Sequence, residues 1–318
     1  MDKLIVSTSP HIRTKISTQN IMADVLIALS PAAIAGIVLF GLRALLLMAV
    51  CVASAVLSEF LFNIIVKKEQ TIKDLSAVVT GLILALSLPV KAQIWQCIVG
   101  SVFAIIVVKC LFGGIGCNFA NPAVTGRVML FVSFSSFISG GAATNFMKNA
   151  GSVDAVSGAT PLQAMKDGSA SLPSLLDMFL GNRGGAIGET CALALIVGFI
   201  YLVVRKVIHW EIPVIFAGSV FLISLLVELD FTMALYQLLG GGLLFGAIFM
   251  ATDYVTSPIN RLGKMVFALG CGILTVVFRY LSTMPEGVSY AILIMNILSP
   301  YIEKLCTRKP LGKGGRTK

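Results

Sequence analysis

The chain has 318 residues, of which 57% are hydrophobic and only 12% are charged, and its mean hydropathy is +0.94. Soluble domains carry about 25% charged residues, so this chain has too few polar side chains to cover its own core in water. The composition therefore excludes an ordinary soluble protein and predicts an integral membrane protein in contact with the lipid bilayer. The net charge of +9 falls in short clusters between apolar runs, which is typical of membrane-protein loops, and we expect no nucleic-acid partner.

Apolar runs close to the length of a membrane-spanning helix recur along the whole chain. They cover residues 21–40, 44–66, 75–89, 94–112, 122–138, 186–204, 212–228, 235–252, 262–281 and 287–303. The third run is short and ends at Pro89, so we expect a broken helix there. The sequence predicts an all-α integral membrane protein with about ten transmembrane helices.

The distribution of basic residues predicts the orientation. With ten spans and the N-terminus inside, 18 of the 24 Lys and Arg residues fall on the inner side. Cytoplasmic loops carry such an excess, so we expect both termini to be cytoplasmic, in a cell inner membrane, and segment 139–183 to face outward.

The two halves of the chain resemble each other. Residues 80–86 (TGLILAL) and 241–247 (GGLLFGA) match at an offset of 161, and the same offset lays the first five runs over the last five. Five spans per repeat require opposite orientations, as in many transporters. We expect a first five-helix repeat at 1–138, an extracytoplasmic loop at 139–183 and an inverted second repeat at 184–318.

Segment 154–160 of the outward loop reads Asp-Ala-Val-Ser-Gly-Ala-Thr. The small residues Ser157, Gly158 and Ala159 leave the hydroxyl of Thr160 uncrowded, and glycine lets backbone amides approach a phosphate. Asp154 is placed to hold the segment in position. By spacing alone an ordinary polar turn explains these residues better, because short motifs often occur by chance.

Several separated stretches resemble the D subunit of the Rnf complexes, which are ferredoxin:NAD oxidoreductases. They are SPHI at 9–12, IMADV at 21–25, ALSPA at 28–32, VTG at 79–81 with LP at 88–89, GCNFANPA at 116–123 and GNRGGAIGET at 181–190. Segment 154–160 is similar to the acceptor motif of flavin transferases, with Asp154, Ser157, Gly158 and Ala159 leading to the acceptor. The resemblance implies FMN joined to Thr160 by a phosphoester, and electron transfer between ferredoxin and NAD coupled to Na⁺ or H⁺ movement.

The resemblance also implies partners and a second cofactor. The partners are the other subunits of the complex, including one with its own tethered FMN, and a flavin transferase for maturation. A second, non-covalent flavin (riboflavin) is implied, but no residue of this chain matches its site, and no residue is assigned a catalytic role. The B subunit of the Na⁺-translocating NADH:quinone reductase shares these features and is one alternative. A channel or transporter is another, although it leaves segment 154–160 without a purpose.

Polar residues near interrupted helices suggest a path for the ion. Asp253 closes the eighth apolar run shortly before Pro258, and Asn118 and Asn121 precede the fifth run. An interrupted helix frees backbone carbonyl groups that can coordinate a cation, and Asp253 would add a negative charge. An interfacial carboxylate at a helix end is the alternative interpretation.

Four further polar residues and one cysteine invite structural explanations. Glu59 and Asn63 lie one turn apart, which favours a hydrogen bond between helices. Glu189 is expected to stabilise a helix N-terminus, with Arg183 compensating its charge if a flavin phosphate lies nearby. Cys117 is either a small buried side chain or a ligand of an iron–sulfur cluster shared with another subunit.

Overall fold

The computed structural model describes residues 17–134, 160–167, 172–282 and 286–307. Its first half contains α1 (Thr18–Phe40), α2 (Leu42–Val66), a 3₁₀ turn η1 (Ile72–Asp74), α3 (Ser76–Leu86), α4 (Ile94–Val102), a π-helix η2 (Phe103–Cys110) that continues α4, and α5 (Pro122–Ser133). Gly41, with φ of 79°, separates α1 from α2. It occupies a left-handed conformation that glycine adopts without steric cost, so two long apolar helices can follow one another directly.

The second half repeats the pattern with a break in the middle. It contains α10 (Ala192–Val204), α11 (Glu211–Glu228), α12 (Phe231–Leu239), α13 (Leu243–Phe245), a π-helix η4 (Gly246–Met250), α14 (Arg261–Leu281) and α15 (Val288–Cys306). The glycines at 240–242 interrupt the helix between α12 and α13, and the two pieces meet at 58°.

The described residues form helices within all ten predicted apolar runs and no strand, which confirms the predicted all-α class. Four of these helices, α1, α2, α11 and α14, are long and apolar enough to cross a membrane, and the bent pair of α12 with α13 and η4 makes a fifth candidate. The remaining helices are shorter or less apolar, so the count of ten crossings stays a prediction. Large apolar side chains point outward along the long helices, among them Val38, Leu42, Ile65 and Leu226, as expected for contact with lipid.

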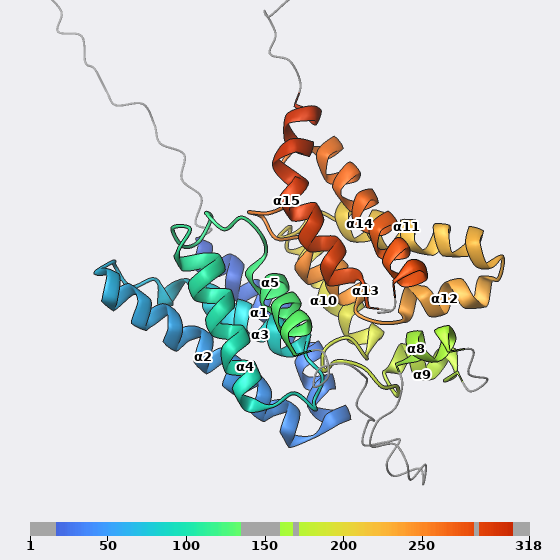
Figure 1. The fold of residues 1–318 in the computed structure, drawn as a ribbon, viewed down its shortest axis with the longest axis horizontal. Coiled ribbons are helices and arrows are strands. Elements are labelled where there is room, and N and C mark those ends of the chain that lie inside the picture. The colour runs from blue at the N-terminus through green and yellow to red at the C-terminus, as the bar shows by residue number, and fades with distance from the viewer. Residues whose placement is uncertain (1–16, 135–159, 168–171, 283–285, 308–318) are drawn as a thin grey trace, which may run out of the picture.

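The helices of each half pack in the same way (Figure 1). In the first half α2 packs against α3 and α4, and in the second half α11 packs against α12 and α14. The halves meet where α1 lies on α10 and where α5 lies on α15. This shared packing agrees with two related halves, while their inverted orientation and the proposed domain boundaries stay predictions.

The segment predicted as an outward loop contains helical structure. Within 139–183 the chain forms two short helices, α8 (Pro161–Lys166) and α9 (Leu175–Leu180), and both contact α12 (Figure 1). Each begins at a hydroxyl residue that accepts a backbone N–H bond, Thr160 from Gln163 and Ser174 from Asp177. Such capping stabilises a helix start, so this connecting segment contains two short helices, while its outward position stays a prediction.

Candidate functional site

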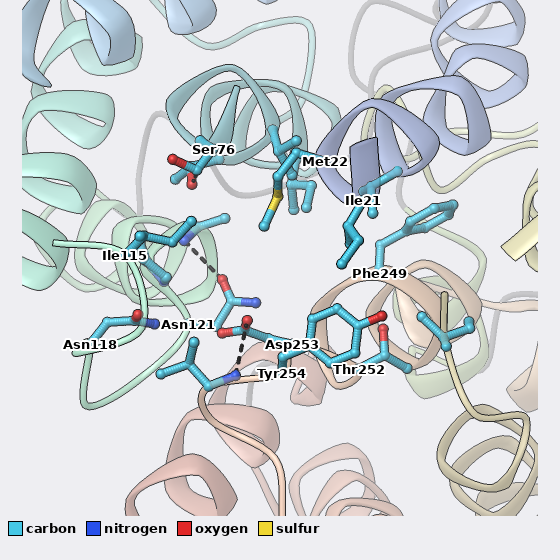
Figure 2. Close-up of a pocket in the computed structure, with 18 of the residues that line it drawn as sticks. Ile21, Met22, Ser76, Ile115, Asn118, Asn121, Phe249, Thr252, Asp253 and Tyr254 are labelled. Carbon is cyan, nitrogen blue, oxygen red and sulfur yellow. Dashed lines mark hydrogen bonds between the residues drawn. The ribbon is translucent and has the colours of Figure 1, made fainter. Parts of the chain in front are cut away.

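A cavity of about 140 Å³ lies between α1, α3, the start of α5 and the two π-helices (Figure 2). Most of its wall is apolar, formed by side chains such as Ile21, Met22 and Phe249. The residues that the sequence suggested for an ion path, Asp253, Asn118 and Asn121, all line this one cavity, although Asn118 and Asp253 lie 135 positions apart in the chain. The fold therefore brings the predicted polar residues together.

The carboxylate of Asp253 has few partners of its own. The hydroxyl of Thr256 donates to its Oδ2 at 3.1 Å, and the backbone N–H of Val255 lies 3.5 Å from its Oδ1. Within the described part of the chain, no basic side chain lies within ion-pair distance of it. Figure 2 shows the side chains of Asp253 and Asn121 at the wall of this cavity. An anion without a protein cation, beside an apolar cavity, favours binding of a cation from solution.

Asn121 is already engaged by the backbone. Its Oδ1 caps α5 by accepting from the N–H groups of Ala123 at 3.0 Å and Val124 at 3.4 Å, and its Nδ2 donates to the carbonyl oxygen of Met250 at 3.0 Å. The side chain thus fixes the end of η4 to the start of α5. Its contribution to the cavity is positional first, because both polar atoms already have protein partners.

A buried ion pair lies at another wall of the cavity, and the sequence interpretation missed it. The Nζ of Lys109, which lines the cavity, lies 3.0 Å from both carboxylate oxygens of Glu59 and 2.7 Å from the hydroxyl of Ser76. The predicted hydrogen bond of Glu59 and Asn63 takes a different form, because Thr71 bridges the two side chains. The sequence interpretation did not single out Lys109, because a basic residue near the end of an apolar run, here 94–112, is typical of the cytoplasmic end of a membrane span.

Two π-helical segments flank the cavity, one from each half of the chain. Lys109 belongs to η2, and η4 carries Ile248 and Phe249 shortly before Asp253. A π-helix accommodates an extra residue in a wider turn, and such turns frequently occur at functional sites. Because both π-helices lie at the wall of the cavity that Asp253 lines, we take this cavity as a candidate functional site.

Thr160 lies elsewhere, next to the break in the second half. The residue is 6% exposed, and its hydroxyl accepts from the N–H of Gln163 at 3.3 Å. The side chain of Leu162 packs against the turn at 240–242, so closely that a Cβ on Gly241 would lie 2.7 Å from Leu162. The remaining motif residues, Asp154, Ser157, Gly158 and Ala159, lie outside the described residues.

A group of buried charges surrounds the same turn. Arg127 lies 3.0 Å from Glu286 and 3.8 Å from Glu189, and Arg279 donates to the carbonyl oxygens of Gln237 and Gly240. These last two contacts satisfy carbonyl groups that the end of α12 leaves free. A Cβ at position 242 would approach the Glu189 carboxylate to 2.8 Å, so the turn passes directly over these charges.

Arg183 does not compensate Glu189 in the way that the sequence suggested. Its guanidinium donates to the backbone carbonyl oxygens of Glu189 at 2.7 Å and Thr190 at 3.2 Å, and it thereby shapes the loop before α10. The nearest cation to the Glu189 carboxylate is Arg127. Glu189 stabilises this loop with its Oε1, which accepts from the N–H of Ala186 at 3.0 Å.

Glu286 lies in the loop between α14 and α15, and its surroundings change its acidity. Burial raises the pKa of its carboxyl group to about 7. Repulsion from Glu189 contributes to this rise, and attraction to Arg127 opposes it. Glu286 is therefore expected to titrate near neutral pH.

Cys117 is exposed in the loop after η2, which contradicts a buried side chain. Three neighbouring glycines, Gly113, Gly114 and Gly116, have φ between 87° and 124°, so they shape this loop rather than allow close helix packing. No group of three or more His, Cys, Asp and Glu side chains suited to a metal is found among the described residues. A cluster at Cys117 would need ligands from another chain.

Comparison with known proteins identifies the family. The model of the NQR2, RnfD, RnfE family matches residues 5–312. The chain is 45% identical to the D subunit of the Na⁺-translocating ferredoxin:NAD⁺ oxidoreductase complex of Acetobacterium woodii, over 97% of this chain and 95% of the relative. It is 39% identical to the D subunit of the proton-translocating ferredoxin:NAD⁺ oxidoreductase complex of Clostridium ljungdahlii, over 94% and 93%. The chain therefore belongs to the NQR2, RnfD, RnfE family, as its resemblance to the D subunit of the Rnf complexes indicated.

Proposed function

We propose that this chain is the D subunit of an ion-translocating ferredoxin:NAD oxidoreductase complex and that it carries FMN on Thr160. In this role it relays electrons between ferredoxin and NAD while Na⁺ or H⁺ crosses the membrane. The observation that carries the assignment is similarity along nearly the whole chain to relatives named as D subunits of such complexes. The apolar helices and the broken span fit a membrane subunit that moves an ion.

The surroundings of Thr160 support a fixed attachment site. The hydroxyl oxygen would form the ester with the flavin phosphate, and Leu162, packed on the 240–242 turn, would hold the attached segment in place. FMN supplies exchange of one or two electrons once it is bound. Because Thr160 is 6% exposed, we propose that the flavin transferase acts before α8 docks on this turn.

The cavity at Asp253 supports a cation site on the other side of the broken span. Asp253 provides the charge, Asn118 lines the wall beside it, and Asn121 fixes the two helix ends that form the site. A carboxylate near the membrane is costly unless it meets water, a partner or a cation. The named relatives include both a Na⁺-translocating and a proton-translocating complex, and either ion fits a single carboxylate.

The proposed role as a D subunit implies partner proteins and a location in the cell. We propose that the chain spans the cytoplasmic membrane with both termini inside and assembles with the other subunits of the complex, one of which carries its own FMN. A flavin transferase is needed for maturation. A second, non-covalent flavin, riboflavin, belongs to the proposal, but no described residue is assigned to it.

A channel or transporter is the competing function, and two features of the structure would fit it. A span bent by 58° and a cavity beside it are the features that such proteins use. A subunit of the Na⁺-translocating NADH:quinone reductase is a second alternative within the same family. The channel leaves Thr160 without a role, and the relatives' names favour the ferredoxin complex over the quinone reductase.

Flavin fluorescence of the denatured chain tests the proposal. The intact complex is purified, unfolded in SDS and separated by electrophoresis, and the band of this chain is inspected under ultraviolet light. We expect a fluorescent band whose tryptic peptide containing Thr160 has gained the mass of an FMN ester. A dark band would contradict the flavoprotein function and leave the channel as the better explanation.

A further inference from the structure

Lys109 is a buried cation whose three hydrogen-bonding sites are all used. Its side chain is 4% exposed and that of Glu59 is 3% exposed. The ammonium group donates to both oxygens of Glu59 and to the hydroxyl of Ser76, at 2.7–3.0 Å. An ammonium group has three donors, so no donor of Lys109 is left for the cavity that its side chain lines.

The charge balance of the cavity depends on this pair. Among the described residues that line the cavity, Lys109 is the basic one and Asp253 is the acidic one. Glu59 is not a lining residue and lies behind Lys109, to which it is bonded. With Glu59 ionised, the charge of Lys109 is cancelled and the cavity keeps the single negative charge of Asp253. Without Glu59, the ammonium group would cancel the charge of Asp253, and a cation from solution would find a neutral cavity.

A purely structural function does not explain this arrangement well. Removing two charges from water costs so much that well-packed apolar side chains of similar size often stabilise a protein as much as a buried ion pair does. The charge pair joins α2 to η2, and apolar residues would suffice for that contact. Lys109 lies at the cavity wall, and Glu59 neutralises it from the side away from the cavity. This arrangement indicates that the pair controls the electrostatic potential in the cavity.

We propose that Glu59 and Lys109 together set the affinity of the cavity for a monovalent cation at Asp253. Glu59 holds the Lys109 ammonium as a neutralised internal cation and thereby lets Asp253 attract the ion from solution. This inference rests on the proposed cation site at Asp253 and adds two residues that determine its affinity. Neither residue contacts the ion; both act through charge.

Variants of the pair test the inference because they predict shifts of opposite sign. The whole complex in sealed vesicles is assayed for ferredoxin-driven NAD reduction at increasing Na⁺ concentration. Glu59→Gln should raise the Na⁺ concentration for half-maximal rate by on the order of tenfold, as expected for one uncompensated charge at the wall of the same cavity at intermediate dielectric. Lys109→Met should lower this concentration, because the charge of Glu59 is then added to that of Asp253. The double variant should return to within about twofold of the wild type.

Controls separate the inference from the proposed function. Asp253→Asn should weaken the Na⁺ dependence in either case, and Glu211→Gln, which breaks the ion pair with Arg261 away from the cavity, should leave it unchanged. An effect of Asp253→Asn without opposite shifts for the pair variants would overturn the inference alone. No effect of Asp253→Asn would overturn the cation site and the inference together. No Na⁺ stimulation of the wild type would overturn the inference and leave H⁺ as the ion of the proposed function.

Some outcomes would indicate a structural pair instead. If Glu59→Gln and Lys109→Met raised the Na⁺ requirement equally, the pair would act by holding α2 to η2, and the inference would be wrong. If Glu59→Gln failed to assemble, the comparison of Lys109→Met and the double variant with the wild type would still decide. A higher Na⁺ requirement in both of these would contradict charge control, whereas wild-type or lower values would support it.

Discussion

The side-chain amide of Asn121 connects the two halves of the chain by donating to the carbonyl oxygen of Met250 at 3.0 Å. Met250 is the last residue of the π-helix η4, and Asn121 is the cap of α5. The carbonyl groups at the end of a helix lack partners within the helix, so one side chain satisfies both a helix end and a helix start. Asn121 thereby holds together two helix ends at the wall of the Asp253 cavity.

Replacing Asn121 should therefore destabilise the protein. Asn121→Ala removes the α5 cap and leaves the Met250 carbonyl buried without this partner, and we expect a loss of about 1–3 kcal/mol. Thermal unfolding in detergent measures the change as a lower Tm. Asn118→Ala is the matched control, because the Asn118 amide donates within its own loop, to the nearby carbonyl oxygen of Ala120. An equal loss in both variants would contradict the connecting role of Asn121.

Thr160→Ala should abolish covalent flavin, because it removes the oxygen that would carry the ester. The chain should still insert in the membrane, and the loss of the α8 cap should cost about 1 kcal/mol. Ser174→Ala removes the equivalent cap of α9 and should leave the flavin in place. The measurement is fluorescence in a denaturing gel, normalised to protein. A Thr160→Ala band that remains fluorescent would show that the attachment site is wrong.

The turn over the buried charges should not tolerate a side chain. In Gly242→Ala the new methyl group would lie 2.8 Å from Glu189 Oε2 and 3.3 Å from a guanidinium nitrogen of Arg127, so we expect a loss of about 1–3 kcal/mol from overpacking. Gly218→Ala, inside α11, would meet no atom within 4 Å and should be neutral or stabilising by up to about 1 kcal/mol. Similar Tm values for the two variants would contradict the tight turn.

Stability should fall as pH rises toward neutrality, in part because of Glu286. Its pKa is raised to about 7 by burial, above the 4.5 of the unfolded chain, so the native state binds the proton more tightly. Stability from this group is present at low pH and is lost between about pH 4.5 and 7. Glu286→Gln should flatten the dependence of Tm on pH in this window. A wild-type and a variant curve of the same slope would show that Glu286 does not titrate there.

The orientation deduced from the basic residues predicts the behaviour of reporter fusions. A reporter that is active only outside the cytoplasm should be active when fused after Met165 in α8 and inactive when fused after Lys318. A cytoplasmic reporter at the same positions is the control and should give the reverse pattern. If the two positions were exchanged, Thr160 would face the cytoplasm and an extracytoplasmic transferase could not reach it.

Composition and periodicity were enough to predict the helices, because a run of apolar residues in lipid has no alternative that satisfies its backbone. They also located Asp253 and Asn121, because glycine and proline mark helix interruptions. They could not predict Lys109 at the cavity wall, since its partner Glu59 is 50 positions away. The cation near the Glu189 carboxylate could not be predicted for a similar reason, because Arg127 approaches from α5, 62 positions earlier in the chain. Arg183, only six positions before Glu189, donates to backbone oxygens instead.

The contact between Leu162 and the glycines at 240 and 241 has a mechanical consequence. Arg279 holds the carbonyl oxygen of Gly240 from α14, and Leu162 presses on the same turn only two positions from Thr160. A group tethered to Thr160 therefore shares a pivot with the bend in the second half. If the bend changed its angle, the backbone at 240–241 would displace both Leu162, beside the proposed attachment site, and Arg279 of α14.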